Sequence, residues 1–133
     1  MKPMRAIARR TRKFANDVSI RSHVVHADEA RETGGSDAGP NAQELLAASL
    51  ASCTAVTMEM YAARKGWDVD GLEVAVDYSP AVRGSATRFS LITRLPAHLT
   101  DEQVERLQVI AARCPVHRTL EGEVLFDERV ERS

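Results

Sequence analysis

The sequence predicts an α+β fold built as a single domain over residues 1–133. Three observations support this prediction: a long apolar helix near the middle of the chain, segments of alternating apolar and polar residues on both sides of it, and a second helical pattern toward the C-terminus. Strands and helices that are segregated along a chain in this way favour antiparallel sheet with helices packed against it. A chain of 133 residues is also long enough to bury its own core.

The composition narrows the classes of function. The formal net charge is −1, so nothing favours binding to nucleic acid or to an anionic membrane. No apolar run is expected to approach membrane-spanning length, and the basic N-terminus lacks the apolar segment of a secretory signal. We therefore expect a cytoplasmic protein, in which the two cysteines are core or redox residues rather than a disulfide scaffold.

The N-terminal part predicts a β-hairpin followed by a loop. Residues 4–11 and 18–26 are rich in β-branched or alternating residues, and Asn16 and Asp17 between them favour a turn there. The next stretch, DEARETGGSDAGPN, has the glycine and proline content of a loop.

A long helix is expected to begin at Asn41. Asn41 and Glu44 have the spacing of an N-cap and its third-residue partner in a capping box. No helix breaker follows until Gly66, which suits the left-handed position after a helix, so the helix should end at Lys65. About 24 residues of helix span roughly 36 Å.

The interior of this helix predicts how it is packed. No charged residue occurs from Leu45 to Met58, and alanines give the helix a slim profile. A helix that is apolar on nearly all sides is usually buried on all sides. One chain of this size has difficulty enclosing such a rod, so we expect a homodimer in which two of these helices meet.

Alternating residues predict three further strands. Residues 72–79 and 87–95 alternate as half-buried strands do, and residues 123–130 are expected to form a closing strand.

Two shorter helices are expected between the strand over residues 87–95 and the closing strand over residues 123–130. One begins at Thr100, with Gln103 as its capping-box partner, and ends near Arg113 because Pro115 disfavours helix at the residue before it. Pro115 then occupies the first position of a second, short helix.

Cys53 lies at the centre of the long helix. Free cysteine is a small residue that is commonly buried, so Cys53 could be inert packing. It is too deep in the helix for the N-terminal end of the dipole to activate it, so a reactive role needs a nearby cation or donor. Glu44 precedes it by nine residues, which is two and a half turns, so the two side chains point to opposite sides. A carboxylate at that position is more often a cap than a catalyst.

Cys114 is better placed for reactivity by its local sequence. It precedes Pro115 and would be the N-cap of the short helix, where unpaired backbone N–H groups stabilise a thiolate. His117 and Arg118, in the next turn, could add positive charge. The alternative is that Cys114 only caps the helix while His117 and Arg118 face solvent.

The histidines do not predict a metal site. His23 and His26 lie three residues apart in an expected strand, so they point to opposite faces of the sheet. Without another cluster of histidine or cysteine, we expect no metal site.

Two motifs identify a family. The segment GGSDAGPNAQELLAASLASCTAVTMEMYAARKGW, together with RCPVHRTL, resembles the OsmC/Ohr family of peroxide-handling proteins. The upstream HVVHADE also resembles the OsmC-like branch, and the resemblance covers roughly residues 18–130. Each of the two main motifs contains one of the cysteines, and they occur in the family's order.

The resemblance implies an interlocked α+β homodimer, in which curved antiparallel sheet wraps a long cysteine-bearing helix. It implies that Cys53 is peroxidatic: its thiolate attacks the O–O bond of an organic hydroperoxide, and a sulfenic acid forms. Cys114 would then resolve the sulfenic acid to a disulfide, and a dithiol reductant, of lipoyl type in the Ohr branch, would restore both thiols. Neither cofactor nor metal is implied.

The chain departs from the family pattern at the residues that activate the first cysteine. The peroxidase branches use an arginine and a glutamate, and the position of that glutamate corresponds to Gln43. The carboxylate of this chain is Glu44, one place and about 100° of helix rotation later, and it is the candidate catalytic carboxylate.

The family's arginine comes from the N-terminal strands, where Arg10, Arg12 and Arg21 are all candidates. His117 and Arg118, beside Cys114, are possible substitutes in this branch and candidate substrate-binding residues.

Three other functions compete with an organic hydroperoxide peroxidase. The same cysteine pair could serve a thiol–disulfide sensor or exchange protein, which Gln43 favours. The chain could also be a dimeric binding protein for a small apolar ligand, with both cysteines inert. A hot-dog-type thioesterase also wraps a long helix in sheet, but the paired cysteine motifs argue against it.

Overall fold

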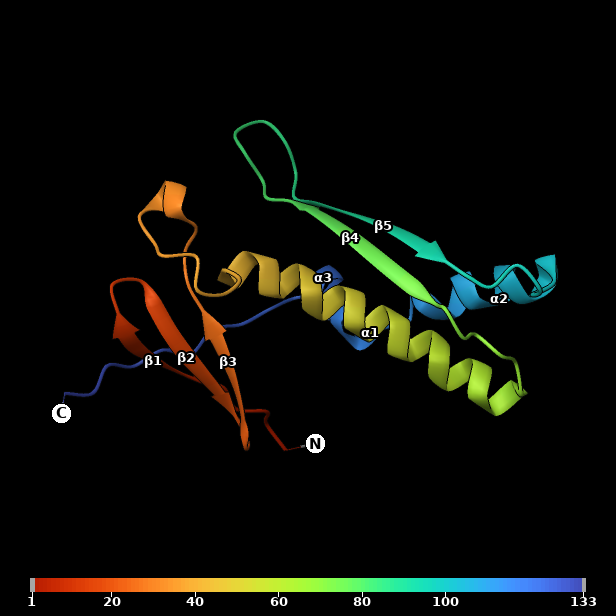
Figure 1. The fold of residues 1–133 in the computed structure, drawn as a ribbon, viewed down its shortest axis with the longest axis horizontal. Coiled ribbons are helices and arrows are strands. Elements are labelled where there is room, and N and C mark those ends of the chain that lie inside the picture. Colours follow the sequence, from red (N-terminus) through yellow and green to blue (C-terminus); the bar gives the residue numbers. More distant parts are fainter. Residues whose placement is uncertain (1, 133) are drawn as a thin grey trace. The chain divides into compact units, whose positions relative to one another are not determined.

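The computed structural model describes residues 2–132 and combines helices with antiparallel sheet, as the α+β prediction requires (Figure 1). The chain forms two compact units, the first up to Ala47 and the second from Ala48. The elements follow in the order β1 (Ile7–Arg12), β2 (Ala15–Ile20), β3 (His23–Ala27), the 3-10 helix η1 (Arg31–Thr33), α1 (Ala42–Lys65), β4 (Glu73–Ser79), β5 (Arg88–Arg94), α2 (Asp101–Ala111) and α3 (Pro115–Glu121).

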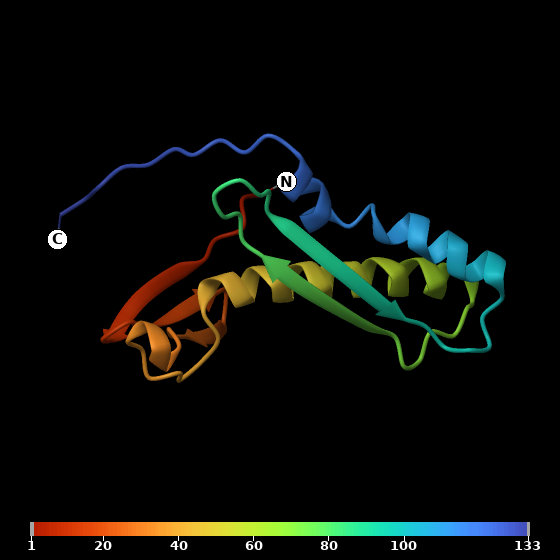
Figure 2. The ribbon, with the colours of Figure 1, turned by 90° about the horizontal axis from the view of Figure 1, so that it is seen from above.

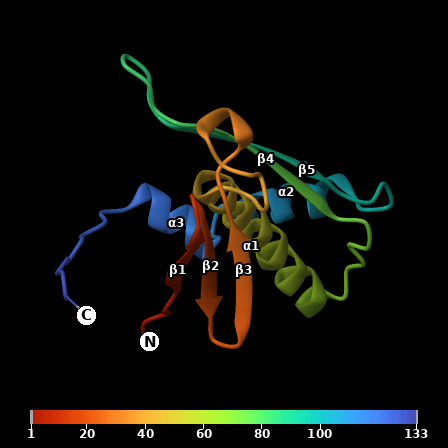
Figure 3. The same cartoon turned by 60° about the vertical axis from the view of Figure 1, so that its left-hand side comes forward.

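The first unit contains a three-stranded antiparallel sheet in the order β1-β2-β3 (Figure 3). The predicted turn at Asn16 and Asp17 is wrong, because both residues lie inside β2. The predicted strand over residues 18–26 is also wrong, because a turn divides it. Lys13 and Arg21 begin the two turns at φ of 46° and 53°. Tight hairpin turns need such left-handed residues, and Lys and Arg give no sequence signal for them.

A buried carboxylate organises the loop after β3. Asp28 accepts hydrogen bonds from the backbone N–H groups of Glu29, Ser36 and Ala38 at 2.7, 3.1 and 3.1 Å. The N–H of Ala38 is the main cause that lowers the pKa of Asp28 below its ordinary value. A Cβ on Gly35 would lie 2.0 Å from the carbonyl oxygen of Glu29, so the close approach of the chain there requires glycine.

The ends of α1 confirm their predicted signals. The side chain of Asn41 accepts from the N–H of Glu44 at 2.8 Å, and the Glu44 carboxylate accepts from the N–H of Asn41 at 2.9 Å. Gly66 ends the helix with φ of 73°. The predicted bounds of the longest helix are therefore confirmed.

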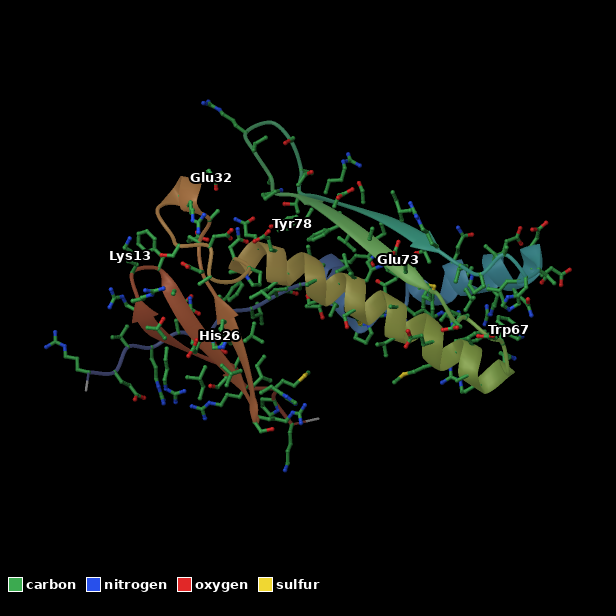
Figure 4. The ribbon with its side chains drawn as sticks, viewed as in Figure 1. Lys13, His26, Glu32, Trp67, Glu73 and Tyr78 are labelled. Carbon is green, nitrogen blue, oxygen red and sulfur yellow. The ribbon has the colours of Figure 1, made fainter. Side chains whose placement is uncertain are left out.

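The second unit has its core between α1, α2 and the β4–β5 hairpin (Figure 2). Met58 and Ala62 of α1 form the centre of the core with Leu99 and Leu107. Val74 of β4, the strand that also carries Glu73 and Tyr78 in Figure 4, packs against this cluster.

The two strands predicted over residues 72–79 and 87–95 are confirmed as a hairpin. Its register pairs Val76 with Leu91, Tyr78 with Phe89, and Glu73 with Arg94.

The C-terminal helices follow their predicted signals, but the last strand does not form. Thr100 and Gln103 make both bonds of the capping box of α2, and α3 begins with Pro115. Residues 123–130 extend from α3 as chain without strand structure (Figure 2), so the predicted closing strand is wrong. Alternation makes a segment able to pair, but a strand exists only where a neighbouring strand supplies its hydrogen bonds.

Only one stripe of α1 is buried within the chain. Leu50, Thr54, Met58 and Ala62 recur every four residues and are at most 2% exposed. Met60 is 61% exposed, so a single chain leaves part of this helix uncovered, as the length of the helix led us to expect. Burial of the remaining faces by a second copy in a homodimer stays a prediction.

The helix α1 is also long enough and apolar enough to cross a membrane, judged by length and composition alone. It is the one helix within residues 2–132 that meets both criteria. The expectation that no run approaches that length is therefore wrong. This is weak evidence for a membrane, because the core helix of a globular protein meets the same criteria, and the buried stripe of α1 packs into a protein core.

Candidate active site

The two cysteines are brought together in the second unit. Cys53 lies midway along α1 and is half-buried, whereas Cys114 is 0% exposed at the start of α3. Both are free thiols, and the side chain of Cys114 interacts directly with the thiol of Cys53.

Cys114 is held in place by the helix that it caps. Its sulfur accepts from the backbone N–H of His117 at 3.5 Å, and its carbonyl accepts from the N–H of Arg118 at 3.0 Å. Pro115 occupies the first turn of α3, where its missing N–H costs nothing. The prediction that Cys114 is an N-cap is confirmed.

Opposing effects act on the ionisation of Cys53. Burial and the neighbouring thiol of Cys114 raise the pKa of the Cys53 thiol above its ordinary value. The backbone N–H of Val116 and the side chain of Thr57 act in the opposite direction, since both stabilise the thiolate. The thiolate of Cys53 therefore depends on the donors that α3 and the next turn of α1 supply.

Cys53 opens into a groove of about 640 Å³ along α1. The α1 residues of the groove follow one face of the helix, and the opposite wall comes from the C-terminal end of α2 and the start of α3. Its lining is largely apolar, includes two arginines and contains no aspartate or glutamate. It is lined by Ser49, Ser52, Cys53, Val56, Thr57, Met60, Arg64, Ile110, Arg113 and Pro115.

The sequence analysis missed five polar residues of this groove, namely Ser49, Ser52, Thr57, Arg64 and Arg113. Thr57 lies one helical turn after Cys53, and Arg64 lies about three turns after it on the same side. Arg113 directly precedes Cys114 in the chain. The helical spacing from Cys53 was the signal that could have found Thr57 and Arg64.

The other candidate side chains lie elsewhere in the structure. The carboxylate of Glu44 is engaged in the cap of α1. His117 lines a separate cavity of about 330 Å³ with Met58 and residues of β5 and α2, and its Nε2 lies 3.2 Å from Oε1 of Glu121. Arg118 is exposed on α3. Neither His117 nor Arg118 is among the residues that line the Cys53 groove.

The N-terminal arginine candidates belong to the first unit. The Nε of Arg10 donates to the carbonyl of Lys13 at 3.1 Å, and the charge of Arg12 helps to lower the pKa of Asp28. Arg21 occupies a turn.

No group of three or more metal-binding side chains occurs within residues 2–132. His26, labelled in Figure 4, is paired with Asp17 in the first unit, with 2.6 Å between Nδ1 and the carboxylate.

Comparisons with known proteins agree with this architecture. The OsmC-like protein family model matches residues 34–129. An OsmC-like protein of Mycoplasma pneumoniae has a similar structure, with a TM-score of 0.76, 20% identity, and coverage of 91% of this chain and 89% of that chain. No curated protein matches the sequence.

Two similar structures have names that refer to hydroperoxides. The organic hydroperoxide resistance protein OsmC of Legionella pneumophila has a TM-score of 0.68 and 19% identity, over 92% of this chain and 93% of that chain. An organic hydroperoxide resistance protein of Elizabethkingia anophelis has a TM-score of 0.69 and 19% identity, over 92% of this chain and 90% of that chain. At these identities the likeness establishes the fold.

Proposed function

The chain belongs to the OsmC-like protein family, and on that premise we propose that it is a thiol-dependent peroxidase that reduces organic hydroperoxides. The observation that carries the proposal is the interaction between the thiols of Cys53 and Cys114 beside an apolar groove. Two similar structures belong to proteins named for organic hydroperoxide resistance, which supports the same substrate class.

The difference in exposure supports the proposed order in which the two cysteines act. Cys53 lines the groove and is within reach of a bound molecule, whereas Cys114 is fully buried. The Cys53 thiolate attacks the terminal oxygen of the hydroperoxide, and the O–O bond breaks. The alkoxide leaves and takes up a proton to become an alcohol, while Cys53 becomes a sulfenic acid. The sulfur of Cys114 then attacks the sulfur of Cys53, water leaves, and a disulfide forms.

The groove favours an organic peroxide over hydrogen peroxide. Val56, Met60 and Ile110 supply apolar surface that a hydrocarbon substituent can cover, and hydrogen peroxide has no such substituent. A dithiol, of lipoyl type on the family resemblance, then reduces the disulfide by thiol–disulfide exchange. We place this cycle in the cytoplasm, where a reducing pool keeps both thiols available.

We also propose that the working form is a homodimer. The exposed face of α1 carries Val56, 40% exposed, and Met60, 61% exposed. Apolar side chains aligned on one face of a long helix are stabilised when a second surface covers them. A second copy packed along this face would turn the open groove into a pocket.

Roles in the chemistry for Glu44, His117 and Arg118 stay predictions, and one substitution tests each. Glu44→Gln keeps a capping-box residue, so a slower peroxide reaction with unchanged melting temperature would assign the carboxylate a catalytic role. Arg118→Ala and His117→Gln test substrate binding in the same way, since a slower peroxide reaction with an unchanged melting temperature would assign these residues a role. Unchanged rates for these two variants would leave both residues outside the site.

One observation favours a second candidate function. The pKa of Cys53 is raised by burial and by Cys114, and no arginine is among the causes that act on it. A thiol with a raised pKa is mostly protonated at neutral pH and is a slow nucleophile, whereas peroxidases, thiol–disulfide exchange proteins and redox sensors all depend on the thiolate. The raised pKa therefore favours a dimeric binding protein for a small apolar ligand, with both cysteines inert. Binding of such a ligand that persists when both cysteines are replaced would select this alternative.

The deciding experiment is intact mass spectrometry of the reduced protein. One equivalent of cumene hydroperoxide is added, and remaining thiols are then alkylated. Loss of two hydrogens with both cysteines protected from alkylation is the expected result, since it reports an intramolecular disulfide. Two alkylated cysteines without oxidation would refute the peroxidase proposal.

A further inference from the structure

We propose that the hydroxyl of Thr57 is a switchable hydrogen-bond donor, which turns from the Cys53 carbonyl to the Cys53 sulfur when that sulfur becomes a thiolate. This inference deepens the proposed function and rests on the assignment of Cys53 as the reactive thiol. It names a residue for which neither the family resemblance nor the sequence pattern gives a role.

The geometry of α1 places Thr57 beside Cys53. The two residues are separated by one helical turn, so their side chains share a face, and both line the groove. The Oγ1 atom of Thr57 donates to the carbonyl oxygen of Cys53 at 2.7 Å. The same hydroxyl also interacts with the thiol of Cys53.

A hydroxyl has a single hydrogen, so it donates to one acceptor at a time. A thiolate is charged and attracts that hydrogen more strongly than a neutral carbonyl does. The carbonyl of Cys53 is not left unsatisfied when the hydroxyl turns away, because in a helix it also accepts the backbone N–H of Thr57. The rotation therefore costs little and stabilises the reactive form.

The surroundings of Cys53 give this donor its importance. Burial and the thiol of Cys114 both disfavour the thiolate of Cys53. The two arginines of the groove, Arg64 and Arg113, take part in none of the salt bridges found among residues 2–132, so no acidic side chain holds either guanidinium group beside the sulfur. Besides the N–H of Val116, Thr57 supplies the other hydrogen bond that favours the thiolate. Once Cys53 is oxidised and uncharged, the hydroxyl returns to the carbonyl.

Thr54 provides a matched control on the same helix. Its hydroxyl donates to the carbonyl of Leu50 at 2.8 Å, which is the same bond to the preceding turn that Thr57 makes. Thr54 is 1% exposed in the buried stripe and does not line the groove. A threonine-to-valine change at either position therefore removes an equivalent backbone bond, but only one removes the donor at Cys53.

The test is the pH profile of Cys53 alkylation by iodoacetamide, resolved from Cys114 by peptide mass spectrometry. In Thr57→Val we expect a rate about fivefold lower at pH 7, as for loss of one hydrogen bond, and convergence with the wild type at high pH. The profile should move toward higher pH, Thr57→Ser should restore it, and Thr54→Val should leave it in place. Melting temperatures report whether each variant is folded, and Thr57→Ala replaces Thr57→Val if valine disturbs the helix.

A profile of Thr57→Val that coincides with the wild type would overturn the proposal. So would a rate lowered by the same factor at every pH, since that reports access rather than ionisation, or a failure of Thr57→Ser to restore the profile. Iodoacetamide does not require peroxidase activity. A shifted profile in a protein that forms no disulfide with cumene hydroperoxide would therefore refute the proposed function and leave the Thr57 switch intact.

Discussion

The thiol of Cys53, midway along α1, interacts with the side chain of Cys114, whose sulfur caps α3 by accepting the N–H of His117. One short helix therefore touches both sulfurs, because the N–H of Val116 also acts on Cys53. The contact with Cys114 helps to raise the pKa of the Cys53 thiol.

Replacement of Cys53 and replacement of Cys114 should affect the peroxide reaction at different steps. Cys53→Ser removes the proposed nucleophile and should lower the rate of cumene hydroperoxide reduction by at least about a thousandfold. Cys114→Ser should keep the first reaction and stop at the sulfenic acid, which dimedone traps. Mass spectrometry after one equivalent of peroxide distinguishes these outcomes. A dimedone adduct on Cys114 in the Cys53→Ser protein would reverse the assignment.

Removal of the Cys114 thiol should make Cys53 more reactive toward alkylation. Cys114 raises the pKa of Cys53, so Cys114→Ala should lower that pKa and increase the rate of iodoacetamide reaction at pH 7. Equal rates for the variant and the wild type in denaturant provide the control, because the contact is then absent. A slower reaction of the folded variant would contradict the prediction.

The raised pKa also predicts how stability depends on pH. The folded protein binds the Cys53 proton more tightly than the unfolded chain does. This contribution is fully present below the pKa of the unfolded thiol, about 8.5, and is lost as the pH rises through the folded value. Urea unfolding from pH 7 to 10 should show the wild type losing more stability than Cys53→Ser. Parallel curves would mean that the pKa of Cys53 is unchanged by folding.

The exposed face of α1 predicts self-association. Sedimentation should give twice the chain mass of 14.6 kDa, and Met60→Glu should weaken the dimer by at least about tenfold, because it places a charge in an apolar contact. Val82→Glu is the matched control, since Val82 is 68% exposed on the loop between β4 and β5. Equal weakening by both variants, or a monomeric wild type, would refute the proposed interface.

The buried carboxylate of Asp28 predicts a local effect in the first unit. Asp28→Asn removes the charge that receives the N–H groups of Ser36 and Ala38, so these amides should exchange hydrogen at least about tenfold faster. The lowered pKa of Asp28 means that protection is present above the unfolded value and lost as the pH falls through the folded one. Asp37→Asn, at an exposed residue of the same loop, is the control. Unchanged exchange in Asp28→Asn would exclude this role.

Local signals in the sequence predicted several parts of the fold correctly. The capping boxes of Asn41 and Thr100, the end of α1 at Gly66 and the N-cap at Cys114 all depend on interactions within a few residues. Such interactions are available to the chain before any tertiary contact forms, so residue type and spacing are sufficient to reveal them.

The sequence predictions were wrong where the local structure depends on a residue type that gives no turn signal or on a pairing strand that is distant in the chain. The turns at Lys13 and Arg21 use residues that seldom adopt positive φ, and the strand expected over residues 123–130 has no partner strand in the structure of residues 2–132. Thr57 was missed although it follows Cys53 by one turn, because a threonine in a helix usually bonds only to its own backbone.

Residue periodicity and capping signals were sufficient to predict the α+β class, the bounds of α1, and the positions of Cys53 within a long helix and Cys114 at the N-cap of a short one, because these are local properties. The contact between Cys53 and Cys114, the single buried stripe of α1, and the groove that Cys53 shares with Thr57 and two arginines became known from the folded chain. These facts depend on how α1, α2 and α3 pack together, and packing joins residues whose separation along the chain carries no information about their distance in space.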